Sequence, residues 1–210
     1  MRAAESSPGN RSGHGPDQPA RREPDRRGRG ARGLPIAEML RSGAASQMIT
    51  IRFAAPEDAG VVLRLIRELA VFEKAPQAVV ATEADLVRHG FGPDRQFEAI
   101  LAFLDSEPAG LALFHPRFST WLGQPGMYLE DLYVVAEARG LGVGRRLMAR
   151  LAAIAVERGW GRLDFQVLDW NPARGFYARL GMAHLGEWLR YGADGEGLRR
   201  LAAQDVDEDC

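Results

Sequence analysis

The chain has 210 residues, 46% of them hydrophobic, and a formal net charge of −1. This length suits one ordinary domain plus an extension, and the balanced charge argues against the broad basic surface that drives nucleic-acid binding. No apolar run approaches the roughly 18 residues that span a bilayer, and the N-terminus lacks the apolar core of a signal peptide. Cys210 is the single cysteine, which excludes an internal disulfide, so a reducing cytoplasm is expected.

Residues 1–47 are rich in Arg, Gly, Pro, Ser and Ala and show hardly any aliphatic periodicity. Such a composition cannot bury enough apolar surface to offset its ordering entropy, so we predict a disordered tail. An RNA-binding arm or a targeting peptide is the alternative for its arginines, but acidic residues interrupt the basic run. Met48 is an alternative start of the protein, because folded-type sequence begins immediately after it. The predicted domain therefore spans residues 48–210.

Apolar periodicity predicts the elements of the first half of this domain. Alternation indicates a strand, a stripe at helical spacing after a proline indicates a helix, and a threonine followed by acidic residues indicates a second helix start. Two further alternating segments flank a turn and predict an antiparallel hairpin. These elements fall at residues 49–53, 56–72, 82–90, 97–104 and 110–115.

The second half predicts a strand, a glycine-rich loop, a helix and another strand, in that order. A shorter helix should begin at Asn171-Pro172, because asparagine suits the cap and proline the first helical position. The predicted strands lie at 127–135, 163–167 and 184–191, and the predicted helices at 145–158, 171–181 and 196–203. Early antiparallel strands and a late parallel crossover make an α+β fold, with a mixed, mostly antiparallel sheet covered by helices on both faces.

The segment Arg139-Gly140-Leu141-Gly142-Val143-Gly144 carries the strongest chemical signal. Glycines let the backbone approach an anion closely, and the helix that follows offers unpaired amides and the positive end of its dipole. A diphosphate is the expected guest, although a plain tight turn is the alternative. The loop lacks the terminal lysine of an ATP-binding loop, since Lys74 is the chain's one lysine, and Arg145 stands where a dinucleotide loop has its third glycine.

Two segments together resemble the GNAT superfamily of N-acetyltransferases. Arg139-x-x-Gly142-x-Gly144 after a strand resembles its acetyl-CoA loop, and Asn171 to Tyr177 resembles its final motif. The stretch from Tyr128 to Val134, Tyr-Leu-Glu-Asp-Leu-Tyr-Val, is similar to the spermidine/spermine (diamine) acetyltransferases. The likeness extends over segments 64–70, 85–92 and 169–171, and it covers residues 49–202.

The resemblance implies an enzyme that uses acetyl-CoA as acetyl donor, with the GNAT fold and a parallel strand splay at the cofactor site. Loop amides would hold the pyrophosphate, and the preceding strand would pair with the pantetheine arm. The implied cofactor-binding residues are Leu132, Tyr133, Val134, Arg139, Gly140, Leu141, Gly142, Val143, Gly144, Arg145, Asn171 and Tyr177. A homodimer is also implied by the resemblance.

Catalysis needs a base, because an alkyl amine with a pKa of about 10 is mostly protonated at neutral pH. Glu130 is the candidate, with an electrostatic or structural role as the alternative. Asp131 is adjacent on the strand and should point to the opposite face unless a bulge intervenes. Tyr177 resembles the family's proton donor, although one aromatic on a helix is commonly a core residue. The segment from Asn171 to Tyr177 is one residue shorter than the usual pattern, which would rotate a helix by about 100°.

The acceptor is expected to be a small cationic molecule with a primary amine, such as a diamine, a polyamine or an amino-acid-like compound. Carboxylates and aromatic walls could bind it through charge and cation-π contacts. The candidates are Phe72, Glu73, Trp121, Glu130 and Asp131, with Trp188 as a further wall. The residues after Glu73 lack the acidic cluster of polyamine enzymes, which weakens spermidine and leaves shorter amines or amino acids open.

Two other functions remain open at this point. The same fold could acetylate a protein N-terminus or a lysine, or it could be a non-catalytic CoA-binding module. The histidines His14, His89, His115 and His184 are scattered without metal-ligand spacing, so no metal site is expected.

Overall fold

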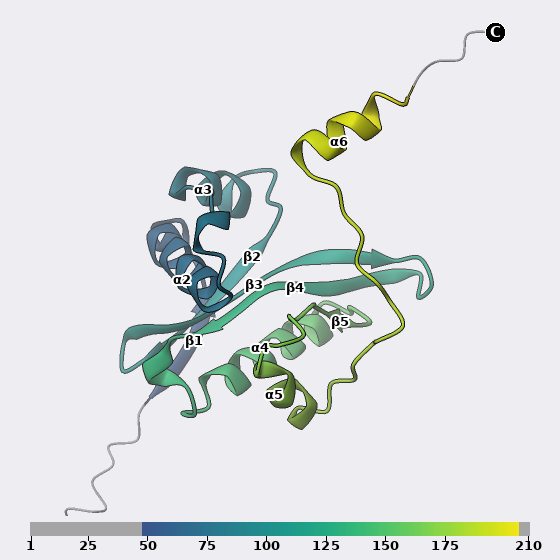
Figure 1. Cartoon of the computed structure of the whole chain (residues 1–210). Coiled ribbons are helices and arrows are strands. Elements are labelled where there is room, and N and C mark those ends of the chain that lie inside the picture. The colour runs from purple at the N-terminus through teal and green to yellow at the C-terminus, as the bar shows by residue number, and fades with distance from the viewer. Residues whose placement is uncertain (1–47, 206–210) are drawn as a thin grey trace, which may run out of the picture. The chain divides into compact units, whose positions relative to one another are not determined.

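The computed structural model describes residues 48–205. The predicted disordered tail, residues 1–47, lies outside this part of the chain. Five strands form one sheet in the order β1-β2-β3-β4-β5, with antiparallel neighbours except for the parallel pair β4 and β5 (Figure 1). Their bounds are Ile49–Phe53, Glu98–Leu104, Glu107–Ser119, Gln124–Val134 and Leu163–Asp164. The predicted mixed, mostly antiparallel sheet is confirmed.

Helices cover both faces of this sheet (Figure 1). On one face lie α2 (Ala59–Phe72) and α3 (Glu83–Phe91), and on the other lies α4 (Val143–Glu157). The short helix α5 spans Ala173–Arg179 and α6 spans Gly195–Ala202, while three single 3-10 turns, Pro56–Asp58, Pro76–Ala78 and Ala136–Ala138, join the elements. Among the helices described, none is long and apolar enough to cross a membrane.

Local side-chain contacts explain where the first helices begin. Asp58 is buried, accepts a hydrogen bond from the Ala55 amide at 2.8 Å and pairs with the Arg52 guanidinium, whose Nη2 lies 2.9 Å away. At α3, Thr82 and Asp85 form a reciprocal capping box, in which each side chain accepts the other residue's amide hydrogen. The predicted start of the second helix is therefore confirmed.

The sheet separates two apolar cores. The core under α4 contains Phe114, Met127, Leu147 and Leu151, and the core under α2 contains side chains such as Leu65. All of these side chains are almost completely buried, so deleting one of them would leave a cavity and cost about 2–5 kcal/mol. The two cores hold β3 and β4 rigidly between the helices.

A β-bulge interrupts the ladder between β3 and β4. Asp131 pairs with Leu113 and Leu129 pairs with Phe114, so Glu130 is the extra residue on β4. The bulge shifts the alternation of side chains along the strand. Met127 and Leu129 face the α4 core before it, whereas Tyr133 faces the α2 core after it. Glu130 and Asp131 are expected to point to opposite faces unless a bulge intervenes; the bulge is present, and both residues line the same cleft.

Three predicted boundaries also differ from the structure. The strand predicted at 163–167 contains only Leu163 and Asp164, because pairing with β4 stops after Tyr128. The hairpin turn between β2 and β3 is tighter than predicted and places Asp105 and Ser106 at positive φ. No strand forms at 184–191 within the described chain, because no sheet edge pairs with that segment and its large apolar side chains stay exposed.

Candidate active site

The glycine loop joins β4 to α4 and has the geometry of an anion site. Gly140 and Gly142 adopt φ values of 81° and 89°, which residues with a Cβ rarely tolerate. α4 begins directly after Gly142, which has no side chain to cap it. Among the described residues, nothing accepts a hydrogen bond from the amides of Val143, Gly144 or Arg145. These amides and the helix dipole can hold a diphosphate, so the residues present fit the pyrophosphate of a CoA ester.

The loop opens into a large cleft of about 1340 Å³. One wall is the end of β4, including Leu132, Tyr133 and Val134, where the strand has no partner beyond Tyr128 on the β5 side. Arg139 ties the loop back to this wall, since its Nε donates to the Val134 carbonyl at 3.0 Å. A strand edge with free backbone groups can pair with an extended amide-containing chain.

The opposite wall comes from the segment after β5 and from α5. Asn171 is buried, and its side-chain oxygen accepts the Ala173 amide hydrogen at 2.9 Å. The helix begins at Ala173 with Pro172 at the N-cap position, one residue later than the predicted cap at Asn171. Tyr177 lies one helical turn after Ala173 and also lines the cleft. Its ring centre is 4.4 Å from that of Phe165. Both residues therefore reach the cleft despite the shortened spacing between them.

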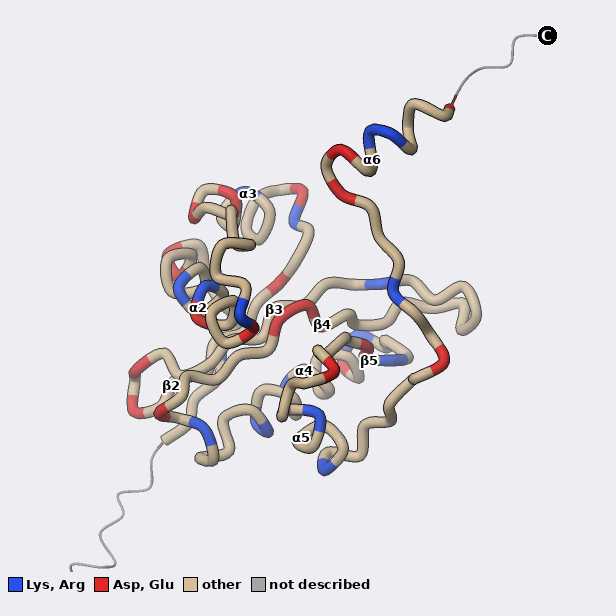
Figure 2. Tube along the Cα trace, in the orientation of Figure 1, with Lys and Arg blue, Asp and Glu red and all other residues tan. Residues whose placement is uncertain are grey.

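Charged residues of opposite sign line different parts of the cleft. Figure 2 shows where charged residues fall along the chain. Arg139 and Arg145 belong to the glycine loop, whereas an acidic group formed by Glu73, Glu130 and Asp131 lies at the end of α2 and in the middle of β4. The first region suits an anion and the second a cation. We call these three carboxylates the acidic cluster.

Asp131 is the buried member of the acidic cluster. Burial, followed by the negative charges of Glu130 and Glu73, raises the pKa of Asp131 from 3.8 to about 6. Glu130 is more accessible, with a side chain 56% exposed and its Oε2 3.7 Å from the Nε2 of His115. The acidic cluster therefore contains one strong proton acceptor and two carboxylates that attract cations.

Tyr177 shares a neighbour with Asp131. Burial, and then the charge of Glu73, raise the pKa of Tyr177 to about 12. Its hydroxyl consequently keeps its proton throughout the neutral pH range and is available there as a proton donor.

Cation-π and ring contacts connect the glycine loop, through Phe72, to Trp170. The Arg139 guanidinium lies 4.8 Å from the Phe72 ring centre, and the centres of the Phe72 and Trp170 rings are 6.3 Å apart. The Lys74 ammonium lies 4.5 Å from the Trp170 ring centre. Lys74 also has a positive φ of 63° at the end of α2, which fixes where the residues after Glu73 turn. Phe72, which the sequence predicted as an acceptor contact, thus lines the cleft and contacts Arg139 on one side and Trp170 on the other.

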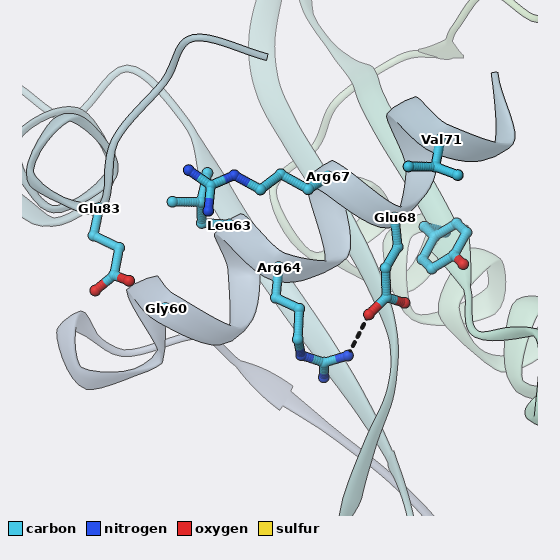
Figure 3. A pocket seen from close by; sticks show the side chains of 8 residues that line it. Gly60, Leu63, Arg64, Arg67, Glu68, Val71 and Glu83 are labelled. Carbon is cyan, nitrogen blue, oxygen red and sulfur yellow. Dashed lines mark hydrogen bonds and ion pairs between the residues drawn. The ribbon is translucent and has the colours of Figure 1, made fainter. Parts of the chain in front are cut away.

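A second, smaller hollow lies on the outer side of α2 (Figure 3). Arg64 and Glu68 pair across one helical turn at 2.6 Å, and Glu83 approaches Gly60 from α3. Tyr133 contributes to this hollow as well as to the cleft. Burial, followed by the charge of Glu68, raises the pKa of Tyr133, so its hydroxyl also stays protonated.

Most of the predicted site residues meet in the cleft, and three do not. Trp121 lies in the turn between β3 and β4 and is 86% exposed. Its ring packs against that of Trp188, with ring centroids 6.2 Å apart, and neither tryptophan lines the cleft. Leu141 is 44% exposed and is not among the residues that line the cleft either. Sequence reasoning missed Tyr128, Arg179 and Arg190, all of which line the cleft. Tyr128 stood inside the motif already quoted, whereas the two arginines carried no recognisable signal.

The described residues contain no candidate metal site that could serve as a second functional centre. No group of three or more His, Cys, Asp or Glu side chains there could hold a metal ion.

The class of protein follows from this fold and from a family comparison. Residues 65–182, more than half of the chain, match the acetyltransferase (GNAT) family. The chain therefore belongs to this family of N-acetyltransferases, whose members use acetyl-CoA as acetyl donor. The membership predicted from the glycine loop and the 171–177 segment is confirmed.

Individual relatives narrow the class. The chain is 37% identical to a thialysine N-epsilon-acetyltransferase of Bos taurus over 168 residues, which are 74% of this chain and 98% of that protein. It is 35% identical to a human spermidine/spermine N(1)-acetyltransferase-like protein 1 over 130 residues, 59% of this chain and 19% of that protein. An integron cassette protein from the mobile metagenome of V. cholerae has a similar structure, with a TM-score of 0.63 at 29% identity, covering 73% of this chain and 97% of that one. The predicted likeness to the diamine acetyltransferases is thus confirmed.

Proposed function

We propose that the protein transfers an acetyl group from acetyl-CoA to the primary amine of a small cationic acceptor, directly and without a covalent enzyme intermediate. One observation carries the proposal: a single cleft runs from an amide-rich helix start to a cluster of carboxylates, with Tyr177 in its wall. A protein or peptide acceptor is less well supported, because the acidic cluster lies inside the cleft.

The cofactor end of the cleft would be formed by the residues predicted from the sequence. The amides of Gly142, Val143, Gly144 and Arg145 hold the diphosphate, and Arg139 adds charge beside them. The free edge of β4 at Leu132, Tyr133 and Val134 pairs with the extended pantetheine arm. When bound, acetyl-CoA supplies the acetyl group as a thioester that an amine nitrogen can attack.

The acceptor end would capture and deprotonate the amine. Glu73 and Glu130 attract the ammonium group, and Asp131 takes its proton so that the nitrogen lone pair is free to form the new C–N bond. Asp131 is the better supported base, because its raised pKa makes it the stronger proton acceptor. Glu130, the base expected from the sequence, remains the second candidate because it lines the same cleft.

Tyr177 would serve the leaving group. As the C–S bond breaks, its hydroxyl donates toward the sulfur, which would otherwise leave as an unprotonated thiolate. The support is that Tyr177 lines the cleft and that its pKa of about 12 keeps it protonated. Overall, the ammonium loses one proton to Asp131, the attacking nitrogen loses a second proton that restores the hydroxyl of Tyr177, a C–N bond replaces the C–S bond, and a free thiol is released.

We also propose a homodimer. An apolar surface on the β3–β4 turn and the segment after α5 supports it, since Phe118, Trp121, Trp188 and Leu189 are each 63–86% exposed. Trp121 and Trp188 pack against each other, with ring centroids 6.2 Å apart, and exposed apolar patches commonly mark interaction sites. Sedimentation analysis of the wild type beside Trp121→Ser tests this, and a monomeric wild type would contradict it.

A thiol-release screen tests the proposed activity. Acetyl-CoA is offered with diamines, polyamines and basic amino acids, and at least one primary amine should release the thiol in stoichiometric amounts with an acetylated product. Asp131→Asn should bind acetyl-CoA but release no thiol. Tight acetyl-CoA binding without turnover of any amine, or turnover of peptides only, would overturn the proposal.

A further inference from the structure

Trp170 is a large aromatic residue that the proposed mechanism does not use. It lies in the turn that joins β5 to α5, between Asp169 and Asn171, which both line the cleft. Trp170 itself is not part of the lining, and 44% of the residue is exposed. Its ring instead contacts the end of α2, where the ring centre lies 6.3 Å from that of Phe72 and 4.5 Å from the Lys74 ammonium.

These contacts join α2 to the wall of the cleft that follows β5. Within residues 48–205, no hydrogen bond or ion pair connects α2 with the segment 165–182. The sheet adds little, because β5 pairs with β4 through only two residues. On the other face, Phe176 and Tyr177 pack against the core under α4. On the α2 side, the connection therefore depends on the ring of Trp170.

The two segments that the ring joins are each closed by their own backbone. At the end of α2, the Glu73 amide donates to the Leu69 carbonyl at 2.8 Å. In the turn around Trp170, the Asn171 amide donates to the Leu168 carbonyl at 2.9 Å. A rigid ring packed between two ordered segments sets the distance between them, because close-packed side chains transmit displacement.

That distance bears on the proposed chemistry, because the two segments carry groups with different tasks. Glu73 directly follows Phe72 and belongs to the acidic cluster, whereas Tyr177 follows Trp170 by two turns of chain and lines the opposite wall. The acidic cluster would hold the amine that attacks the acetyl carbon, and Tyr177 would protonate the sulfur that leaves the same carbon. A displacement of about 1 Å between such groups can lower a rate about 100-fold.

We infer that Trp170 is a positioning residue, whose contacts with Phe72 and Lys74 hold Tyr177 at its working distance from the acidic cluster. The inference rests on the proposed function and adds a residue to it. Trp170 acts through Tyr177, since its own ring does not line the cleft.

Steady-state kinetics with the best amine of the thiol-release screen test this role. Trp170→Leu should lower kcat about 10-fold and leave KM for acetyl-CoA within about 2-fold, because the glycine loop and the edge of β4 are unchanged. Trp170→Phe keeps a ring beside Phe72 and should recover most of the loss. Lys74→Met removes only the cation and should lower kcat roughly 2- to 5-fold. Unchanged kcat in Trp170→Leu would overturn the inference and leave the proposed function standing.

A double variant separates positioning from a general loss of stability. In the background of Tyr177→Phe, Trp170→Leu should lower kcat by less than about 2-fold, because the group that it positions is already gone. An equal loss in both backgrounds would contradict the inference.

Trp160→Leu is the matched control. Trp160 also carries a stacked cation, with the Arg158 guanidinium 4.9 Å from its ring centre, but it follows α4 and does not line the cleft. Its loss should leave kcat within about 2-fold at a temperature where the variant is folded. A loss of kcat equal to that of Trp170→Leu would overturn the inference.

Hydrogen exchange gives a readout that needs no turnover. Trp170→Leu should speed exchange of the amides in residues 168–180 about 10-fold, while those of β4 keep their rates. Unchanged exchange would overturn the inference whichever amines are acetylated. Faster exchange in a protein whose wild type acetylates no amine would overturn the proposed function and the catalytic role of Trp170, and would leave its contact with α2 standing.

Discussion

Asp131→Asn should make the protein more stable at neutral pH and inactive. The folded state holds the Asp131 proton more tightly than the unfolded chain, since the pKa of Asp131 is raised from 3.8 to about 6. Its contribution to stability is therefore fully present below pH 3.8 and is lost as the pH rises through about 6. The difference of about two pKa units corresponds to about 3 kcal/mol above pH 6. Asparagine is nearly the same shape and never ionises, so it escapes this penalty.

Urea unfolding of the wild type and Asp131→Asn at several pH values between 4 and 8 measures the effect. The variant should be more stable by up to about 3 kcal/mol at pH 7, and the difference should shrink toward zero near pH 4. Acid-labile pairs such as Arg52–Asp58 are common to both proteins and cancel in the difference. Glu130→Gln, an exposed neighbour, should change stability by only about 0.5 kcal/mol. A pH-independent difference, or a less stable Asp131→Asn at pH 7, would refute the reasoning.

Three further changes test the remaining roles. Acetyl-CoA should raise the Tm of the wild type and of Gly123→Asp, but not of Gly142→Asp. Gly123 is a matched control, because both glycines have positive φ and a Cβ at either would meet no other atom within 4 Å. The two differ in that Gly142 lines the cleft and Gly123 does not. Tyr177→Phe should lower kcat about 100-fold with little change in KM for acetyl-CoA. Tyr191→Phe, at an exposed tyrosine, is the control and should have no effect. Equal turnover of the two variants would remove Tyr177 from the mechanism. Asn171→Ala should cost about 1 kcal/mol in unfolding free energy through the lost hydrogen bond to the Ala173 amide at the start of α5, and a neutral effect would contradict that role.

The elements that depend on local patterns could be predicted from the sequence. The α3 start follows from Thr82 and Asp85, and the start of α4 after the glycine loop follows from glycines placed immediately before an apolar helical stripe. Both signals lie within a few residues, so no knowledge of distant partners was needed.

Features that depend on distant partners could not be predicted. The bulge at Glu130 arises from how β4 pairs with β3. The apolar alternation of β4 by itself describes a regular strand and gives no sign of the bulge. Trp121 appeared to be a substrate wall because it is a large aromatic, but its place is set by the length of the β3–β4 hairpin. Segment 184–191 has the alternation of a strand without a sheet edge to pair with, and Arg190 gained its position only through the path of that segment.

The bulge also bears on how the acceptor preference of such a cleft can change. Glu130 has no partner in the β3–β4 ladder, whereas Asp131 is in register with Leu113. Replacing the side chain of Glu130 therefore leaves the sheet pairing and both cores in place. Deleting the residue would remove the bulge but keep Leu129 paired with Phe114 and Asp131 paired with Leu113, so Tyr133 would stay on the α2 face. The side chain at position 130 can therefore vary without disturbing the sheet, which makes it a site where a new acceptor could be selected by single substitutions without loss of the fold.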